Sequence, residues 1–453
     1  MDSGFGIAGR ERSYTELTTS RLDYFTPVVF ENGVKKSVDL ELRPLSNNED
    51  GPFEFSYQPD GKKFVDMSTL TIHGRMGVRV QDGAGKWVVP NKITDLDKWG
   101  VINNCYQSLF STVSIKVGDL EIMDPGSFSY PYHAYIQTLL GTSASQNKNH
   151  IHEPRGFIKD SQSVSTPDLS AGGSYKRRRK PFEDSDWSDF VIELHHDLCN
   201  LEKYLPPGVK LSFTLRRSAD EFVLFNTRDT KERNFKIVLE DIHLKMKVLE
   251  VQDSVLQHHF KQREGKLPLQ IKFTRNMLKT FAVPKGSFEM THHNLFFGTN
   301  LPNRLYIAFV EQEAYNGSVY KNPFNFEVAS MQESCLLVNS IQEPRPPLVL
   351  EKDRTEKALY FNFLENTGRS SFETDSVNIS FEEYMNGYFI LAFDRSPCKD
   401  NGLYNHFPDS GHISVNVKCR EALKKNYMVL CFASYDEKLV FVEDRVLTQP
   451  LYE

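Results

Sequence analysis

The sequence predicts an all-β protein made of two consecutive antiparallel sandwiches, and three observations support this fold class. Apolar and polar side chains alternate along many short segments, as in half-buried strands. Aromatic residues, which favour strands, are frequent, with 33 Phe and 19 Tyr among 453 residues. The predicted strands also follow one another without the strand–helix–strand alternation of parallel sheets. We therefore expect sandwiches with short inserted helices.

The clearest alternating segment is LTIHGRMGVRV at 70–80, where Leu70 and Ile72 share one face and Thr71 and His73 share the other. Residues 209–217 and 412–419 alternate in the same way. Each segment therefore predicts a strand with one buried face and one solvated face.

A longer segment, FKIVLEDIHLKMKVLEV at 235–251, changes phase in its middle. Ile237 and Leu239 occupy odd positions, whereas Ile242 and Leu244 occupy even positions. A slip of one residue exchanges the two faces of a strand, so this pattern predicts a bulge or sharp bend between Leu239 and Ile242.

Five runs are apolar on both faces, which predicts strands covered on both sides. They are LYIAFV at 305–310, CLLV at 335–338, YFILAF at 388–393, YMVLCF at 427–432 and LVFV at 439–442. Gly118 and Asp119 predict a two-residue hairpin between 113–117 and 120–122. Short helices are predicted at 131–140, 253–261 and 353–365.

The polar stretch NTRDTKERN at 226–234 predicts a boundary that divides the chain almost in half. The expected organisation is an N-terminal arm at 1–30, a first eight-stranded jelly roll at 31–230, a second at 231–446 and a C-terminal tail at 447–453. Residues 142–185 are poor in apolar side chains and predict a long exposed loop. The two halves share no clear residue-level repeat, so the duplication is inferred from their layout.

Composition excludes several classes of protein. A net charge of −6 disfavours a surface devoted to nucleic acid, so at most non-specific genome contact is expected. The six cysteines form no C-x-x-C pair and indicate buried thiols in a reducing compartment. The first 20 residues contain no apolar signal region, and no run reaches the length of a membrane span. We expect a soluble protein that is not secreted by the ordinary route.

No catalytic motif is present. GFGIAG at 4–9 formally matches the dinucleotide-binding fingerprint, but only three residues precede it, so the required strand before the glycines is missing. We expect no enzyme activity, small-molecule substrate, cofactor or metal. The histidine pairs at 195–196, 258–259 and 292–293 are poor chelates, because neighbouring residues of a strand point to opposite faces. The only concentrated basic run is Lys176, Arg177, Arg178, Arg179 and Lys180. It is compatible with a nuclear import signal, a polyanion-binding patch or a solvated charge run, and exposure is expected in each case.

Four segments carry a resemblance to a known family: NNCYQSLFSTVSIKVGDLEI, YPYHAYIQTLLG, KLSFTLRRSADEFVL and YNGSVYKNPFNFEV, in this order. Together they resemble the major capsid proteins of Polinton (Maverick) elements and adintoviruses, which resemble the double jelly-roll coat proteins of adenoviruses and tectiviruses. The likeness spans roughly residues 95–345. Its most specific residues are Asn103, Asn104, Ser108, Leu109, Phe110, Tyr130, Pro131, Tyr132, Asn322, Pro323, Phe324, Asn325 and Phe326.

The resemblance implies a homotrimer in which six sandwiches surround one axis and form a pseudo-hexagonal tile. Such tiles would pave an icosahedral shell around a double-stranded DNA genome, beside penton or minor capsid proteins. The protein would be made in the host cytoplasm and reside in the virion, and assembly in the nucleus would account for an import signal. The doubly apolar runs suit a permanent interface within the trimer.

Two other functions fit the predicted fold. A cellular β-sandwich protein that binds a ligand or partner would be a stable monomer or dimer, whereas a penton or minor capsid protein would usually be a single, pentameric jelly roll. The stretch VYKNPFNFEV at 319–328 is expected to be a corner between a helical insertion and a strand. Phe324 and Phe326 would then anchor one face of that strand.

Overall fold

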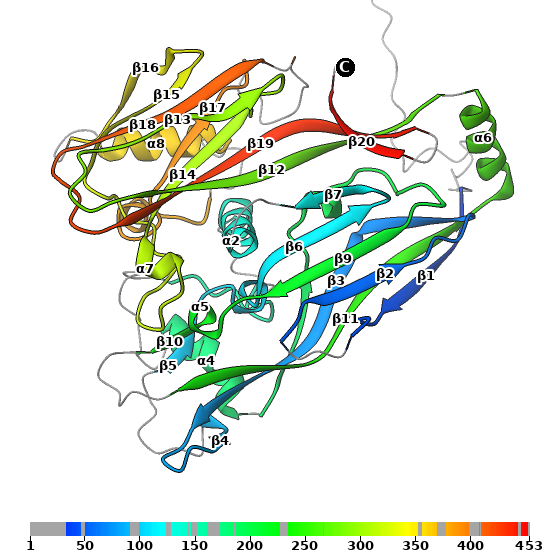
Figure 1. Cartoon of the computed structure of the whole chain (residues 1–453), viewed down its shortest axis with the longest axis horizontal. Helices are drawn as coiled ribbons and strands as arrows, with labels where there is room; N and C mark the ends of the chain where they lie inside the picture. The colour runs from blue at the N-terminus through cyan, green and yellow to red at the C-terminus, as the bar shows by residue number, and fades with distance from the viewer. Residues whose placement is uncertain are drawn as a thin grey trace, which may run out of the picture.

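The computed structural model describes residues 33–46, 50–90, 99–123, 128–143, 145, 152–160, 173–184, 186–226, 234–265, 267–351, 356–368, 377–397, 407, 409–442 and 445–451. The predicted N-terminal arm at 1–30 lies outside these residues. Two β-sandwiches lie beside each other, and helix α2 (Ser129–Gly141) lies between them (Figure 1).

Two facing sheets make up the first sandwich. Its strands are β1 (Val34–Leu42), β2 (Phe53–Tyr57), β3 (Lys63–Gln81), β6 (Phe110–Val117), β7 (Leu120–Met123), β8 (Ser188–Glu193), β9 (Leu211–Arg217) and β11 (Phe235–Val251). One sheet has the order β1-β11-β3, with β8 and the short β4 (Trp87–Val88) also paired to β3, and the other has the order β2-β9-β6-β7. All these pairs are antiparallel.

The second sandwich repeats this arrangement. Its strands are β12 (Leu269–Val283), β13 (Glu289–Gly298), β14 (Arg304–Glu311), β15 (Met331–Val338), β16 (Ile341–Val349), β17 (Ile390–Asp394), β18 (Gly411–Cys419) and β19 (Tyr427–Val442). The sheets have the orders β12-β19-β14-β17 and β13-β18-β15-β16. The all-β prediction of two antiparallel sandwiches with short helices is therefore confirmed.

Short elements connect the sandwiches and cover their ends. They are β5 (Trp99–Val101), β10 (Leu224–Asn226), α1 (Cys105–Ser108), α4 (Ser174–Asp184), η2 (Asp197–Asn200), α5 (Asp220–Val223), α6 (Asp253–Glu264), α7 (Gln312–Tyr315), α8 (Glu356–Asn366), α9 (Phe381–Met385) and β20 (Arg445–Pro450). The three predicted helices correspond to α2, α6 and α8. In the part of the chain that is described, no helix is long and apolar enough to cross a membrane.

Several local predictions are confirmed. The phase change in β11 is a bulge, because the pairing of β11 with β3 shifts between Glu240 and His243, and Asp241 adopts a positive φ of 53°. Gly118 turns at φ 62° between β6 and β7, whose last and first residues, Val117 and Leu120, pair directly.

The strand pairing places the division between the two sandwiches after the predicted boundary at 226–234. Residues 235–251 were expected to open the second jelly roll, but β11 pairs with β1 and β3 in the first sandwich. The two sets of strands therefore separate at α6. A polar loop marks a turn in the chain, but alternation alone does not identify the sheet that the following strand joins.

Two predictions for the C-terminal region are wrong. The apolar runs at 427–432 and 439–442 belong to one 16-residue strand, β19, rather than two. Residues 445–450, which span the start of the predicted tail, form β20 and pair with β19. Val446 is 7% exposed, so this segment contributes to the core.

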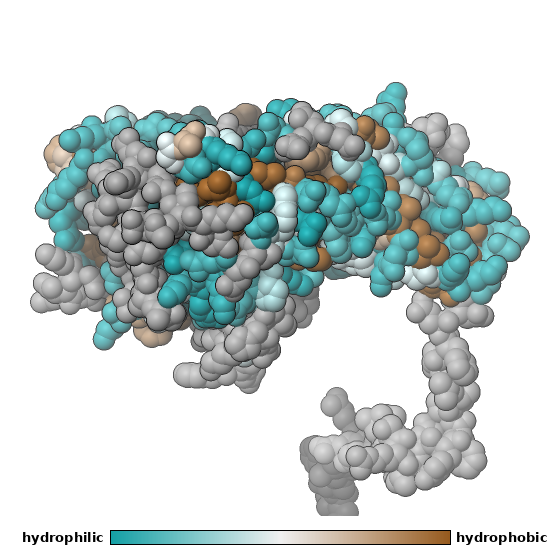
Figure 2. All heavy atoms as spheres, turned by 90° about the horizontal axis from the view of Figure 1, so that it is seen from below, coloured by the Kyte–Doolittle hydropathy of each residue, from teal (hydrophilic) through white to brown (hydrophobic). Residues whose placement is uncertain are grey.

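The buried apolar side chains form one large cluster that runs through both sandwiches and the region between them. On the face seen in Figure 2, hydrophilic residues predominate and hydrophobic ones form patches between them. The continuous cluster indicates that the two sandwiches are packed against each other as one unit.

Candidate functional site at the junction of the two sandwiches

The first motif segment forms a buried turn that leads into α1. Asn104 adopts a left-handed conformation at φ 53°, which asparagine tolerates better than most residues. The Asn103 Oδ1 atom accepts hydrogen bonds from the backbone N–H groups of Asn104 (2.9 Å) and Ile158 (3.0 Å). Ser108 Oγ donates to the Asn104 carbonyl at 3.0 Å. The bond from Ile158 attaches the turn to the segment at 152–160.

The rest of this motif enters the core of the first sandwich. Leu109 and Phe110 are at most 1% exposed. Phe110 packs edge-on against Phe53 of β2, the edge strand of the same sheet, with 6.4 Å between ring centroids. Their role is packing rather than chemistry.

The second motif segment begins helix α2. Pro131 lies in the first turn of the helix, where its missing N–H group would have had no intrahelical partner. The Tyr130 hydroxyl donates to Gln107 Oε1 at 2.5 Å, and Gln107 Nε2 donates to the Glu193 carbonyl at 2.7 Å. This chain of bonds links α2 to α1 and to the end of β8.

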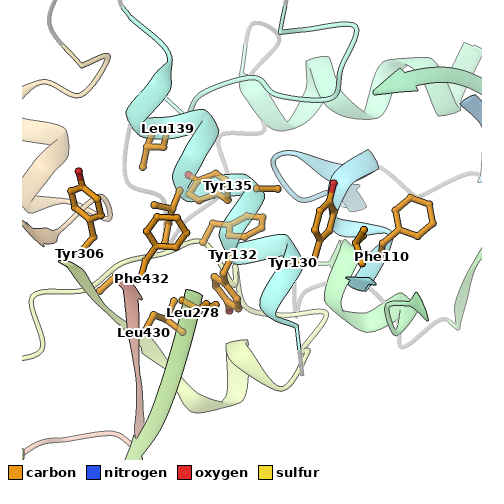
Figure 3. Packing of buried hydrophobic residues seen from close by; sticks show 14 of the residues in the cluster. Phe110, Tyr130, Tyr132, Tyr135, Leu139, Leu278, Tyr306, Leu430 and Phe432 are labelled. Atoms are coloured by element: carbon orange, nitrogen blue, oxygen red, sulfur yellow. The ribbon is translucent and has the colours of Figure 1, made fainter. Parts of the chain in front are cut away.

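Helix α2 belongs to the first sandwich by sequence but also packs against the second. Tyr132 stacks on Tyr315 of α7 with 5.5 Å between ring centroids, and His133 packs edge-on against Phe432 of β19 at 5.1 Å. Figure 3 shows α2 with Leu278, Leu430 and Phe432 of the second sandwich beside it. We call this region, where α2 and the segments at 152–160 and 322–326 meet the second sandwich, the junction.

Residues 322–326 of the fourth motif segment also lie in the junction. Asn322 Oδ1 accepts the Phe324 N–H at 3.0 Å, which fixes a tight turn. Phe324 stacks on Tyr135 of α2 with 4.0 Å between ring centroids, and Phe326 contacts the same ring edge-on at 5.8 Å. All three side chains are fully buried.

The corner prediction for this segment is correct in part. The helical insertion is α7, and Phe324 and Phe326 are buried anchors as expected. No strand starts there, however: Phe326 makes only isolated bridges, donating its N–H to the Gly387 carbonyl (2.9 Å) and accepting from the Phe389 N–H (3.3 Å). The regular strand β15 begins at Met331, because turns at 322–325 and 329–330 prevent continuous pairing.

Polar contacts also cross the junction. Both Asp197 carboxylate oxygens accept hydrogen bonds from Asn276 of β12, one from its backbone N–H and one from its side-chain amide, each at 2.8 Å. Lys159 Nζ pairs with Glu383 Oε2 of α9 at 2.6 Å, with side chains 8% and 19% exposed. Directional bonds of this kind fix the orientation of one sandwich relative to the other.

The basic run contradicts the predicted exposure only in part, because Lys176, Arg177 and Lys180 are exposed and two arginines are buried. Lys176–Lys180 lies in α4, and Arg178 and Arg179 are 3% and 7% exposed. Arg178 Nη1 contacts Asp160 Oδ1 at 3.0 Å and donates to the Ile158 carbonyl at 2.6 Å. The described parts of 142–185 are therefore largely packed rather than a projecting loop. The low apolar content of this segment did not predict its burial, because charged groups such as Arg178 and Asp160 are buried as a pair.

Burial holds two titratable groups of the junction, His195 and the Cys105 thiol, in their uncharged forms. Burial lowers the pKa of His195 to about 4, and neighbouring positive charge on His133 and Arg155 adds to the effect. Burial raises the pKa of the Cys105 thiol to about 12, so the nucleophilic thiolate is suppressed at neutral pH. These shifts indicate a packed interior rather than an activated nucleophile.

A cavity of about 310 Å³, lined mostly by residues with polar side chains, opens beside the C-terminal end of α2. Its charged residues, Arg155 and Glu193, pair with each other at 2.6 Å. Across the described ranges, no three His, Cys, Asp or Glu side chains are grouped so that they could hold a metal ion.

The structure brings three of the four motif segments together, although their residues lie as much as 223 positions apart in sequence (103 to 326). Sequence reasoning missed Tyr135, Lys159, Asp160 and Asp197, which complete the junction. Only Tyr135 carried a signal, since it lies one helical turn after the Tyr130-Pro131-Tyr132 motif. Lys159, Asp160 and Asp197 are single charged residues in polar segments, and nothing in the sequence signalled their roles.

The apolar runs at 305–310 and 427–432 are covered on both sides within the chain itself. Tyr306 and Phe432 of their strands face the junction, and Ile307 and Cys431 face the opposite sheet. The prediction that these runs supply a subunit interface is therefore wrong, because α2 already covers the second face.

No family model matches this sequence. An uncharacterised protein of Caenorhabditis elegans is 22% identical over 402 residues, which cover 86% of this chain and 90% of that protein.

Among solved structures, a chain of the Sputnik virophage is similar with a TM-score of 0.60 and 11% identity, covering 97% of this chain and 94% of that chain. The mavirus major capsid protein has a TM-score of 0.55 and 11% identity, with coverage of 99% and 96%. The Faustovirus major capsid protein has a TM-score of 0.56 and 9% identity, with coverage of 95% and 93%. At these identities the likeness establishes the fold, which is the double jelly roll.

Proposed function

We propose that this chain is a major capsid protein that forms homotrimeric, pseudo-hexagonal capsomers of an icosahedral shell around double-stranded DNA. The observation that carries the proposal is the pair of sandwiches with the same strand order, held in one orientation by the buried contacts of the junction. A rigid pair of similar sandwiches is what a tile requires. The likeness to capsid proteins over nearly the whole chain supports it.

Three-fold symmetry would turn two sandwiches per chain into six around one axis. Contacts within such a trimer are expected to be large and permanent, whereas contacts between trimers are smaller and more polar. Capsomers would therefore form first and shells later. The partners would be other copies of the chain, together with penton or minor capsid proteins at the vertices.

We assign the chain to the Polinton (Maverick) and adintovirus type because of its sequence motifs, several of which lie in the junction. The relative in Caenorhabditis elegans, a cellular organism, favours this type. The protein would be made in the host cytoplasm and reside in the virion, with at most non-specific genome contact. Nuclear import through Lys176–Lys180 would require a rearrangement, since Arg178 and Arg179 are buried.

A structural rather than catalytic role fits the junction, where burial holds the thiol of Cys105 in its protonated form. A cellular ligand-binding function is the second candidate, and the cavity of about 310 Å³ favours it, since this volume is at the lower end of small-molecule sites. A penton or minor protein with one sandwich is disfavoured by the two sandwiches of this chain.

The test is the native mass of the purified protein by light scattering over a range of concentrations. The capsid proposal expects three times 52.2 kDa, about 157 kDa. A monomer at all working concentrations would reject it and leave the ligand-binding protein as the better account.

A further inference from the structure

The two sandwiches have the same topology, strand for strand. If the eight strands of each are numbered in chain order, leaving out the short β4, β5, β10 and β20, both have one sheet in the order 1-8-3-6 and one in the order 2-7-4-5. Helical insertions occupy the same place in both, between the fifth and sixth strands. These are α2 and α4 in the first sandwich, and α8 and α9 in the second. Helices α2 and α8 are therefore topological equivalents.

Within the chain, the insertion of the first sandwich covers the 1-8-3-6 sheet of the second. Leu278, Phe432 and Tyr306 pair side by side across β12, β19 and β14, and thus share the face that meets α2. His133 packs on Phe432, and Asp197 bonds to Asn276 on the same face. One insertion thus lies on one sheet face.

Among the described residues, the equivalent insertion and the equivalent face on the other sandwich both carry exposed apolar side chains. Phe361 of α8 is 63% exposed, although Leu359 and Phe363 of the same helix are buried at 3% and 1%. On the 1-8-3-6 sheet of the first sandwich, Val191 of β8 is 49% exposed and pairs with His73 of β3.

This sheet face is charged as well as apolar. His73 stacks on His243 of β11 with 5.1 Å between ring centroids. Arg75 contacts Asp189 at 2.9 Å and Glu240 at 3.5 Å on the same face. It would accept an aromatic side chain between polar groups, as at an interface more polar than the junction.

We propose that α8 of one subunit lies on the outer face of β11, β3 and β8 of a second copy of this chain, with Phe361 directed toward Val191 and the His73–His243 pair. The inference rests on the trimer proposed above. In a closed ring, each sandwich must contact the next through a head-to-tail interface. The contact that α2 makes inside the chain is the template for the contact between chains.

The experiment compares Phe361→Ser and Val191→Glu with the parent protein by light scattering during dilution. Each substitution should raise the concentration at which the trimer dissociates by roughly tenfold or more. Because both side chains are substantially exposed in the single chain, its far-ultraviolet circular dichroism should not change. Phe297→Ser is the matched control, since Phe297 of β13 is 74% exposed but lies in the other sheet of the second sandwich, and its trimer should dissociate like the parent.

Hydrogen exchange gives an independent measurement. Peptides covering α8 and the strands β3 and β8 should be protected in the trimer and exchange faster after dissociation. If the parent is a trimer and neither substitution changes its dissociation or its hydrogen exchange, the inference is overturned but the capsid proposal stands. A monomeric parent overturns both.

Discussion

Replacement of Phe326 by alanine tests whether the junction determines the stability of the whole chain. The Phe326 ring is fully buried and contacts Tyr135 of the other sandwich edge-on, with 5.8 Å between centroids. Truncation of an enclosed phenylalanine costs about 3–5 kcal/mol, because buried area is lost and a cavity remains. The hydrogen bonds to Gly387 and Phe389 use only backbone atoms and should persist, so the loss isolates packing.

The assay is thermal unfolding of the purified variant beside its parent. At about 2–4 °C for each kcal/mol, the unfolding midpoint should fall by roughly 6–20 °C. Phe297→Ala is the control: this ring is 74% exposed, so its loss should change stability by about 0.5 kcal/mol or less. If Phe326→Ala unfolds together with its parent and the control, the segment at 322–326 is not the anchor that the buried contacts indicate.

Three further predictions follow from charges and thiols. Burial holds the pKa of His195 at about 4 in the folded protein, against 6.5 in the unfolded chain, so the unfolded chain binds the proton first as the pH decreases. The free energy of unfolding should therefore fall by up to about 1.4 kcal/mol per pH unit between pH 6.5 and pH 4. His195→Gln should flatten this part of the stability–pH curve, and an unchanged slope would assign the acid sensitivity elsewhere. Lys159→Met or Glu383→Gln alone should destabilise the protein by about 3 kcal/mol, because each leaves a buried charge without its partner. In denaturant titrations, the double variant should lose less stability than the sum of the two single losses. Strictly additive losses would argue against coupling across the junction. In a Cys398→Ser variant the remaining thiols are all buried, so a chromogenic thiol reagent should react only on unfolding, and rapid reaction of the native protein would contradict the packing.

Features carried by local sequence could be predicted. The bulge at Asp241 follows from a change of phase within one strand, and the hairpin at Gly118 follows from a turn dipeptide. The burial of Phe324 and Phe326 was also expected, because two aromatics beside a proline turn indicate an anchored corner. In each case the determining interaction lies within a few residues.

Features that depend on distant partners could not be predicted. The sheet that β11 joins depends on β1, which lies some 200 positions earlier. The burial of Arg178 depends on Asp160 and the Ile158 carbonyl, so part of a basic run that resembles an exposed signal is packed inside. The apolar second face of β14 and β19 is explained only when α2 of the other sandwich is seen to cover it.

The most direct test of the central claim is the shape of the purified particle in negative-stain electron microscopy. Two-dimensional class averages viewed along the symmetry axis should show six lobes of similar size, two from each of three chains, with three-fold rather than strict six-fold symmetry. Averages with only two lobes per particle, at concentrations where the protein is otherwise well folded, would contradict the capsomer.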